Sequence, residues 1–185
     1  MESHERQVVL DQLITSEARL LELVDDLTPA QWNFHETPER WSIAENIEHL
    51  VVFEKFITEK IREALEQPGD GPGKDSVVAK DTLVFGLATG RNAKFKAREA
   101  ARPTGRWPDT AELIAEFRKT RARSRAFASE VFAPESQAAL RDHFFPHIVF
   151  GDLDCYQWLV VLGQHGLRHA FQIAEIKAHP AYPGI

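Results

Sequence analysis

The sequence has a single cysteine, Cys155, among its 185 residues, so no disulfide can form within the chain. Disulfides belong to oxidising compartments, and the charged start MESHERQ resembles neither a signal peptide nor an anchor. We therefore expect a cytoplasmic protein. A chain of this length buries about 70% of the surface that it exposes when unfolded. One globular domain over residues 1–185 can thus be stable without covalent links.

Long apolar runs are also missing. The most apolar stretches, Leu50–Phe56 and Leu159–Leu162, are much shorter than the roughly 20 residues that a membrane-spanning helix needs. Lys and Arg number 22 against 28 Asp and Glu, which gives a net charge of -6 that repels nucleic acid backbones. The basic residues Arg118, Arg121 and Arg125 recur at helical spacing and are expected on a solvated helix face. We predict neither a membrane nor a nucleic acid as partner.

Strand signals are scarce, whereas apolar residues recur at three- and four-residue intervals in four long stretches separated by segments rich in proline and glycine. This pattern predicts an all-α protein, an antiparallel bundle of four long helices. The expected helices span about 5–27, 42–66, 109–127 and 152–178. Residues 77–100 are expected to form short or kinked helix and loop. Residues 134–151 are expected to be mostly loop, with a short helical turn near 137–141.

Three of the eight histidines have a pattern that suggests a metal site. His165 and His169 are four residues apart, so on a helix they differ by about 40° in rotation and about 6 Å in rise. Both rings could therefore reach one ion, and imidazole nitrogen is a good ligand for zinc and similar metals. His49 lies among apolar residues, where a buried imidazole needs a partner. The alternative is that each is a core histidine hydrogen-bonded to a neighbour.

The motifs around these histidines resemble those of a known family. They are WSIAENIEHL at Trp41–Leu50, YQWL at Tyr156–Leu159 and HGLRHAFQI at His165–Ile173, and together they are similar to the DinB-like, YfiT-like metalloenzyme superfamily. The resemblance covers most of the chain. It implies a four-helix bundle of up-down-down-up order with short extra helices in the long connections. It also implies a divalent metal held by His49, His165 and His169.

Three protein ligands would leave at least one coordination position open, whereas structural zinc sites are closed by four. An ion there could lower the pKa of a bound water or hold a thiol as its thiolate. Members of the superfamily include transferases that use low-molecular-weight thiols. We therefore expect a bacterial metal-dependent S-transferase or hydrolase of small molecules. Zinc is the first choice of ion and nickel the second, and a homodimer is compatible with the class. The alternative is a non-catalytic metal-binding or ligand-binding module.

Three further residues are candidates for supporting roles. Glu45 lies one turn before His49 and could orient it, bind the ion or act as a base; its alternative role is in the capping box that starts the helix. Gln172, three residues after the histidine pair, could approach the site. His147 lies in the loop before the last helix, near the expected mouth of a pocket; the alternative is an ordinary surface histidine.

Three other residues near the last histidines are interpreted more simply. Gly166 is unusual inside a helix and could leave space for a large side chain, a ligand or substrate. Arg168 is expected to face a carboxylate or a substrate anion, because guanidinium does not bind metals. Cys155 is about 15 Å from His165 along the helix and is expected to be a small buried apolar side chain.

Overall fold

The computed structural model describes residues 3–69, 79–90, 99–133, 136 and 138–184. Four long helices form the bundle: α1 (Ser3–Leu23), α3 (Ile43–Leu65), α6 (Thr110–Val131) and α7 (Cys155–Lys177). Short elements lie in the connections: α2 (Pro29–Trp32), α5 (Ala79–Phe85), the 3-10 helix η1 (Glu99–Ala101), and the strands β1 (Phe144–His147) and β2 (Gly151–Asp154). None of the helices described here combines the length and apolar character needed to cross a membrane.

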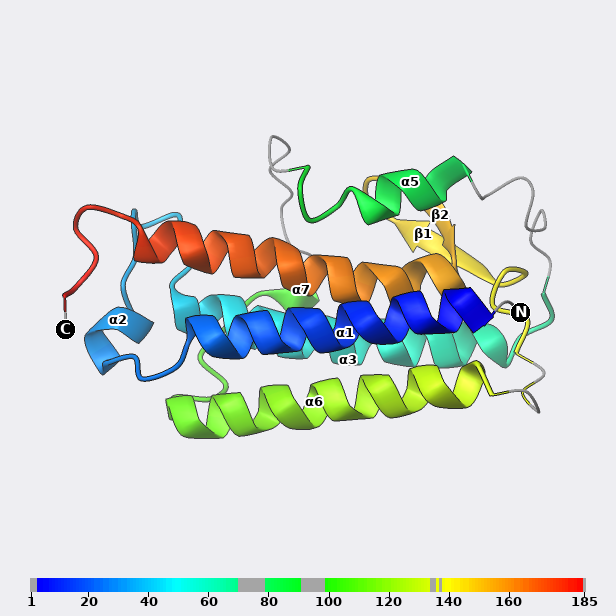
Figure 1. The fold of residues 1–185 in the computed structure, drawn as a ribbon, viewed down its shortest axis with the longest axis horizontal. Helices are drawn as coiled ribbons and strands as arrows, with labels where there is room; N and C mark the ends of the chain where they lie inside the picture. Colours follow the sequence, from blue (N-terminus) through cyan, green and yellow to red (C-terminus); the bar gives the residue numbers. More distant parts are fainter. Residues whose placement is uncertain (1–2, 70–78, 91–98, 134–135, 137, 185) are drawn as a thin grey trace.

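The order of the four long helices is up-down-down-up. Figure 1 shows α1 and α7 running in one direction and α3 and α6 running in the other. Helix α1 packs against α7 and α6, and α3 packs against α6 and α7. The bundle therefore contains two parallel neighbouring pairs, α1 with α7 and α3 with α6. The expected antiparallel arrangement is therefore corrected at these two pairs. The connection between the parallel helices α3 and α6 carries α5 and η1, whereas α2 and the hairpin lie in the α1–α3 and α6–α7 connections, which join antiparallel helices.

Side-chain caps determine where the helices begin. The Ser42 hydroxyl accepts a hydrogen bond from the backbone N–H of Glu45 (3.2 Å), and the Glu45 carboxylate accepts one from the N–H of Ser42 (2.7 Å). Asp109 accepts from the N–H of Glu112 at the start of α6 (2.9 Å). Such caps satisfy N–H groups that have no partner within the helix. The predicted starts of the second and third long helices are thereby confirmed.

The apolar core consists of two clusters along the bundle axis. Each long helix contributes to both: Val9, Ile61, Phe127 and Leu159 belong to the first, and Leu20, Ile47, Phe117 and Ile173 to the second. On each helix a small or polar residue separates the two contributions: Ser16, Glu54, Arg121 and Gly166. The Arg121 guanidinium pairs with the Glu54 carboxylate at 3.1 Å, and both side chains are almost fully buried. The bundle therefore has a polar layer between two apolar cores.

This layer corrects one prediction. Arg118 and Arg125 are exposed or half-buried, but Arg121 is buried and does not lie on a solvated face. Helical spacing placed the three arginines on one side of α6 but could not place the buried carboxylate of Glu54 opposite one of them. The pairing of charges across helices decides which arginine is buried.

The segment before the last helix corrects a second prediction. Residues 144–154 form an antiparallel hairpin, in which Phe144 pairs with Asp154 and His147 with Gly151. The turn depends on Gly151, whose φ of +68° favours glycine. Because β2 occupies 151–154, α7 begins at Cys155, three residues later than expected. Residues 140–142 form a turn within the predicted 137–141 region, of which residue 137 lies outside the described part.

Two further helix ends differ from the predicted ones: α1 ends at Leu23, whereas residue 27 was expected, and α6 ends at Val131, whereas residue 127 was expected. A turn over residues 24–26 follows α1, and a capping box between Thr28 and Gln31 starts the separate helix α2. The weakly patterned region 77–100 contains α5, part of η1 and a turn, as expected; residues 77–78 and 91–98 lie outside the described part.

Candidate metal centre

The structure brings together the three histidines singled out by the sequence. His49 comes from α3, whereas His165 and His169 lie one turn apart on α7. The Nε2 atom of His165 lies 3.3 Å from Nε2 of His49 and 3.1 Å from Nε2 of His169. Among the residues that the structure describes, these three form the group that could hold a metal ion, with ligand atoms within 4.8 Å of one another.

Hydrogen bonds on the far side of two rings determine their tautomers. His49 Nδ1 lies 2.6 Å from the carbonyl oxygen of Ala101, and His169 Nδ1 lies 2.7 Å from Oδ1 of Asn46. Oxygen acceptors require an N–H, so both Nδ1 atoms donate. In the neutral rings, the Nε2 atoms that face the cluster therefore carry lone pairs. This is the form in which imidazole binds a metal.

The amide of Asn46 is itself held in one orientation. Its Nδ2 donates to the backbone carbonyl of Ser42 at 2.7 Å, within the first turn of α3. The Asn46 oxygen consequently points to His169, and the flipped amide would lose both hydrogen bonds. Asn46 is 3% exposed, so water cannot easily replace these partners.

The cluster fits a bound divalent ion better than it fits hydrogen bonds among the histidines alone. Nε2 of His165 faces two lone pairs, and it can donate a proton to only one of them. Its Nδ1 is buried without a hydrogen-bond partner. Two ligands at 2.0–2.1 Å from a tetrahedral zinc lie about 3.3–3.4 Å apart. The observed separations of 3.1 and 3.3 Å are close to this value.

Burial favours the neutral rings. Loss of solvation lowers the pKa of His49, although its hydrogen bond to Ala101 acts in the opposite direction. Burial also holds the pKa of His165 well below its ordinary value, and the neighbouring rings of His169 and His49 add to the effect. Neutral imidazole is the species that binds metals, so the site is prepared for an ion at neutral pH.

Glu48 holds the chain segment that contains the hydrogen-bond partner of His49. It is 4% exposed, and its carboxylate accepts hydrogen bonds from the backbone N–H of Thr104 (2.8 Å) and Gly105 (2.9 Å) and from the Arg106 guanidinium (2.7 Å). Burial raises the pKa of Glu48, but these hydrogen bonds outweigh it, so the pKa lies below its ordinary value. The segment held in this way also carries Ala101, whose carbonyl accepts from the first histidine.

Aromatic rings enclose the cluster on two sides. The ring centroid of Trp41 lies 4.8 Å from that of His49, and the Trp41 ring is nearly parallel to that of His169 at 6.4 Å. The Phe53 ring lies 4.1 Å from that of His165. His49 and His169 are each 4% exposed, whereas His165 is partly exposed. The cluster is therefore most accessible on the side of His165.

The other candidate supporting residues each have contacts of their own. The Glu45 carboxylate caps α3, as in its alternative role, and lies 3.6 Å from His35 Nδ1. Gln172 has a buried Oε1 without a hydrogen-bond partner. His147 lies in the hairpin, where its Nδ1 accepts from two backbone N–H groups and its ring stacks on Phe150 at 4.7 Å.

Gly166, Arg168 and Cys155 have structural contacts. A Cβ at Gly166 would lie 3.0 Å from the Cβ of Ser16 and 3.1 Å from the Arg121 guanidinium, so the glycine leaves space for a large side chain of the polar layer. Arg168 donates to the carbonyls that follow α5, at 3.0–3.1 Å. Cys155 is fully buried, which confirms its prediction, and burial raises its pKa to about 12.

Sequence reasoning missed two residues of the centre, Asn46 and Glu48. Both lie in the motif WSIAENIEHL, and Asn46 lies three residues before His49, on the same side of the helix. A polar side chain at that spacing inside an apolar stripe was the available signal. The identity of its partner on α7 depends on how the two helices pack.

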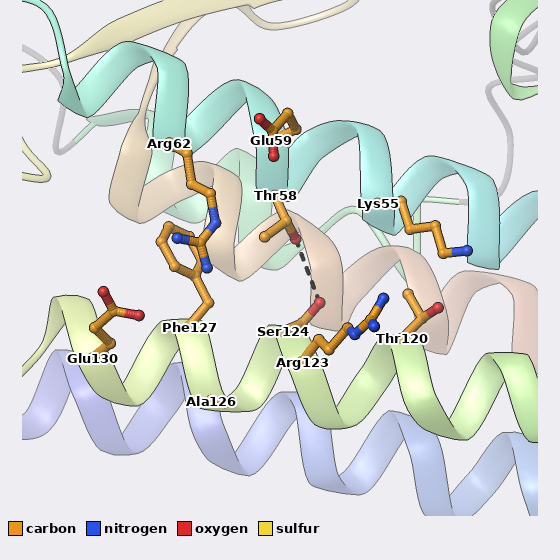
Figure 2. Close-up of a pocket in the computed structure, with 10 residues that line it drawn as sticks. All are labelled: Lys55, Thr58, Glu59, Arg62, Thr120, Arg123, Ser124, Ala126, Phe127 and Glu130. Atoms are coloured by element: carbon orange, nitrogen blue, oxygen red, sulfur yellow. Dashed lines mark hydrogen bonds between the residues drawn. The ribbon is translucent and has the colours of Figure 1, made fainter.

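A separate groove lies between another pair of helices of the bundle. It has a volume of about 450 Å³ and is formed by α3 and α6, with both basic and acidic side chains in its walls. Figure 2 shows Arg62 lying over the Phe127 ring and the hydroxyl groups of Thr58 and Ser124 joined by a hydrogen bond (3.4 Å). No histidine lines this groove. It is therefore separate from the centre between α3 and α7.

The fold and the histidine cluster define a class of protein, the up-down-down-up bundle with three histidines that could hold a metal. The chain belongs to the DinB superfamily, whose family model matches residues 12–173. The resemblance drawn from the motifs is thereby confirmed.

Two of the individual proteins to which it is similar come from Bacillus subtilis. The uncharacterized protein YuaE of Bacillus subtilis (strain 168) is 26% identical over 151 residues, which are 82% of this chain and 86% of that protein. The solved structure of YfiT from Bacillus subtilis has a TM-score of 0.64 and 12% identity, covering 99% of this chain and 91% of YfiT. That report describes YfiT as "a probable metal-dependent hydrolase with an unusual four-helix bundle topology". At this identity the likeness shows the fold.

Proposed function

We propose that this protein is a divalent-metal-dependent enzyme acting on a small molecule, with His49, His165 and His169 as the metal ligands. The observation that carries the proposal is the convergence of three Nε2 atoms at 3.1 and 3.3 Å, two of them with their lone pairs directed inward by hydrogen bonds on Nδ1. The description of YfiT, which shares the fold, supports the same class of activity.

An open coordination position favours catalysis over a purely structural role. The described group contains three histidines and no carboxylate or thiolate as a fourth member. Three protein ligands are typical of catalytic zinc sites, whereas structural sites use four. When bound, the ion would supply Lewis-acid activation of a water or thiol nucleophile at neutral pH. The chain's own contribution is to orient the ligands through Asn46, Ala101 and Glu48 and to enclose the site with Trp41 and Phe53.

Hydrolysis is the reaction that we favour, because the structural neighbour is described as a hydrolase. Transfer to a low-molecular-weight thiol is the second reaction class that the same site could support, since a thiolate is a good metal ligand. Zinc remains our first choice of ion and nickel the second, because imidazole accepts both. The rival proposal is a module in which the ion only stabilises the bundle.

Cobalt(II) titration of chelator-washed protein tests the metal site. We expect about one ion per chain, a visible spectrum typical of nitrogen ligands, and loss of this binding in His165→Ala. His4→Ala, which changes an exposed histidine of α1, is the matched control and should bind cobalt normally. Equal binding by wild type and His165→Ala would contradict the assignment of the ligands.

The same cobalt-loaded protein separates enzyme from structural module. If a coordination position is open, acetohydroxamate or a thiol will change the cobalt spectrum. A spectrum that stays the same with both additions would indicate a closed site and favour the structural module. Elemental analysis of protein reconstituted with zinc and nickel together would then identify the preferred ion.

A further inference from the structure

A small apolar slot lies at the hairpin end of the bundle. Its volume is about 210 Å³, and it is lined by residues of α3, β1 and α7: Phe56, Ile57, Lys60, Phe145, Pro146 and Trp158. The rings of Phe145 and Trp158 are parallel, with an interplanar angle of 6° and centroids 4.5 Å apart. The indole N–H donates to the Phe145 carbonyl at 3.1 Å. These contacts hold the wall of the slot in place.

The slot lies on the same side of both helices as the histidine cluster. Phe56 comes seven residues after His49, and Trp158 comes seven residues before His165. Seven residues of α-helix make about two turns, so residues seven apart lie on the same side of the helix, within about 20° in rotation. They are separated by a rise of about 10 Å. Helices α3 and α7 are antiparallel, so both steps lead towards the hairpin (Figure 1). The slot is therefore about 10 Å from the histidines along the α3–α7 seam.

Two rings border the interval between the slot and the histidines. Phe53 lies one turn after His49 on α3, and its ring contacts that of His165, with centroids 4.1 Å apart. The His147 ring, on β1, lies 5.1 Å from the indole of Trp158. Aromatic groups therefore continue along the seam from the slot to the metal ligands.

We propose that the slot holds an apolar arm of the substrate whose polar end reaches the metal centre. The inference rests on the proposed function and names a substrate class: a small molecule with a metal-binding group and, about 10 Å from it, a phenyl ring or short alkyl group. A dry apolar cavity of roughly 150 Å³ accepts benzene, so about 210 Å³ is large enough for one ring. The mixed charges of the larger groove between α3 and α6 suit such an arm less well.

Paired probes test the proposal on zinc-loaded protein by calorimetry. Acetohydroxamate supplies the metal-binding head alone, and 5-phenylpentanohydroxamate adds a phenyl ring separated from the head by about the proposed distance. Burial of a phenyl group is expected to tighten binding by about 10-fold or more. Phe56→Ala should remove most of this gain and leave acetohydroxamate binding unchanged. Phe85→Ala, which truncates an exposed phenylalanine of α5 outside the slot, should preserve the gain.

Two results would overturn the proposal. The first is equal affinity for the two hydroxamates in the wild type. The second is a gain that survives in folded Phe56→Ala. Phe56→Trp, which fills the slot instead of opening it, is the second variant and should abolish the gain in the same way.

A further experiment distinguishes an error in the slot proposal from an error in the metal-site proposal. If acetohydroxamate does not bind zinc-loaded protein, the proposal of an open coordination position is wrong. The slot is then judged with 5-phenyl-1-pentanol on metal-free protein, using the indole N–H resonance of Trp158. A shift of that resonance that is lost in Phe56→Ala would support the slot as a site for an apolar arm, whereas no shift would overturn it.

Discussion

Two of the buried polar clusters that contact α7 differ in how their charges and lone pairs are matched. At the start of the helix, Arg141 lies among the carboxylates of Glu5, Asp81 and Asp154 at 2.8–2.9 Å. In the middle of the helix, the three histidines direct nitrogen atoms at one another, and the described chain places no cation between them. The first cluster is complete within the protein, whereas the second leaves inward lone pairs that could bind the proposed ion.

The Arg141 cluster joins separate parts of the fold. Glu5 belongs to α1, Asp81 to α5 and Asp154 to the cap of α7. The guanidinium also lies over the Tyr156 ring, 3.9 Å from its centroid. Burial lowers the pKa of Arg141, but its hydrogen bonds to the three carboxylates outweigh burial and raise the net pKa above the ordinary value.

The comparison teaches how to distinguish a structural polar cluster from a binding site. In a structural cluster, the donors and acceptors satisfy one another, as the guanidinium and the carboxylates do around Arg141. In the histidine cluster, the outward atoms Nδ1 of His49 and His169 are satisfied, but the inward lone pairs exceed the protons available. Both clusters are buried, so burial does not distinguish them. The distinguishing feature is the set of unmatched lone pairs that point into the histidine cluster.

The largest effect on stability is expected for Arg141→Met. Removing one member of a buried ionic cluster leaves uncompensated charges and typically costs about 3–5 kcal/mol. Urea unfolding of the metal-free protein measures this loss. Cobalt binding under conditions where the variant is folded should stay at one ion per chain, because the histidines are not touched.

Arg118→Met on the exposed face of α6 is the matched control and should change the unfolding free energy by less than about 0.5 kcal/mol. A similar loss in both variants would show that the Arg141 cluster does not stabilise the fold. Loss of cobalt binding from folded Arg141→Met would remove the distinction between the two clusters.

Of the two clusters, only the histidine cluster was predicted from the sequence, and its parts were predicted in different ways. The spacing of His165 and His169 places them on one face of a helix whatever the tertiary structure, so local geometry was sufficient. The contact with His49 depends on the packing of α3 against α7, which periodicity does not determine. For that step the prediction relied on the resemblance to a family.

Backbone partners were harder to predict than side chains. Any residue has a carbonyl, so nothing in the sequence indicated that Ala101 would accept from His49. The same reason explains the hairpin: the residues of β1 and β2 do not alternate strongly, and their pairing depends on backbone hydrogen bonds and on the turn at Gly151. The Arg141 cluster was not predicted, because its members lie far apart in the sequence.

A smaller effect is expected at Asn46, which accepts a hydrogen bond from His169 Nδ1 and is not one of the proposed metal ligands. Asn46→Ala removes the acceptor for His169 Nδ1 and is expected to weaken metal binding by about 10- to 100-fold. Asn46→Asp keeps an oxygen acceptor but loses the amide donor to Ser42, so its loss should be smaller. Cobalt or zinc competition titrations with a chelator of known affinity measure both.

The control for Asn46 is Asn33→Ala, which removes a side-chain amide that donates to the Pro29 carbonyl at an exposed position. Metal affinity should be unchanged in this variant. If Asn46→Asp bound metal as weakly as Asn46→Ala, the oxygen acceptor would not be the feature that matters.

The smallest effect is expected for Glu48→Gln. This variant tests whether a carboxylate whose hydrogen bonds are all made within the protein also affects metal binding. The neutral amide keeps one acceptor oxygen but replaces the second with an NH2 group that cannot accept, and it lacks the charge that pairs with Arg106, so the loss of stability should be about 1–2 kcal/mol. Metal affinity should fall less than 10-fold, because Glu48 acts on the ligands only through the segment that carries Ala101. Glu59→Gln, at an exposed position of α3, is the control.

The pH dependence of this variant shows which property of Glu48 matters. Its pKa in the folded protein is lowered from an ordinary value of 4.5, so the carboxylate stabilises the fold above that value and the contribution is lost as pH falls through the folded pKa. The difference in unfolding free energy between wild type and Glu48→Gln should therefore be constant near neutral pH and shrink below about pH 4.5. A difference that persisted in acid would mean that shape, and not charge, makes Glu48 hold the segment behind His49.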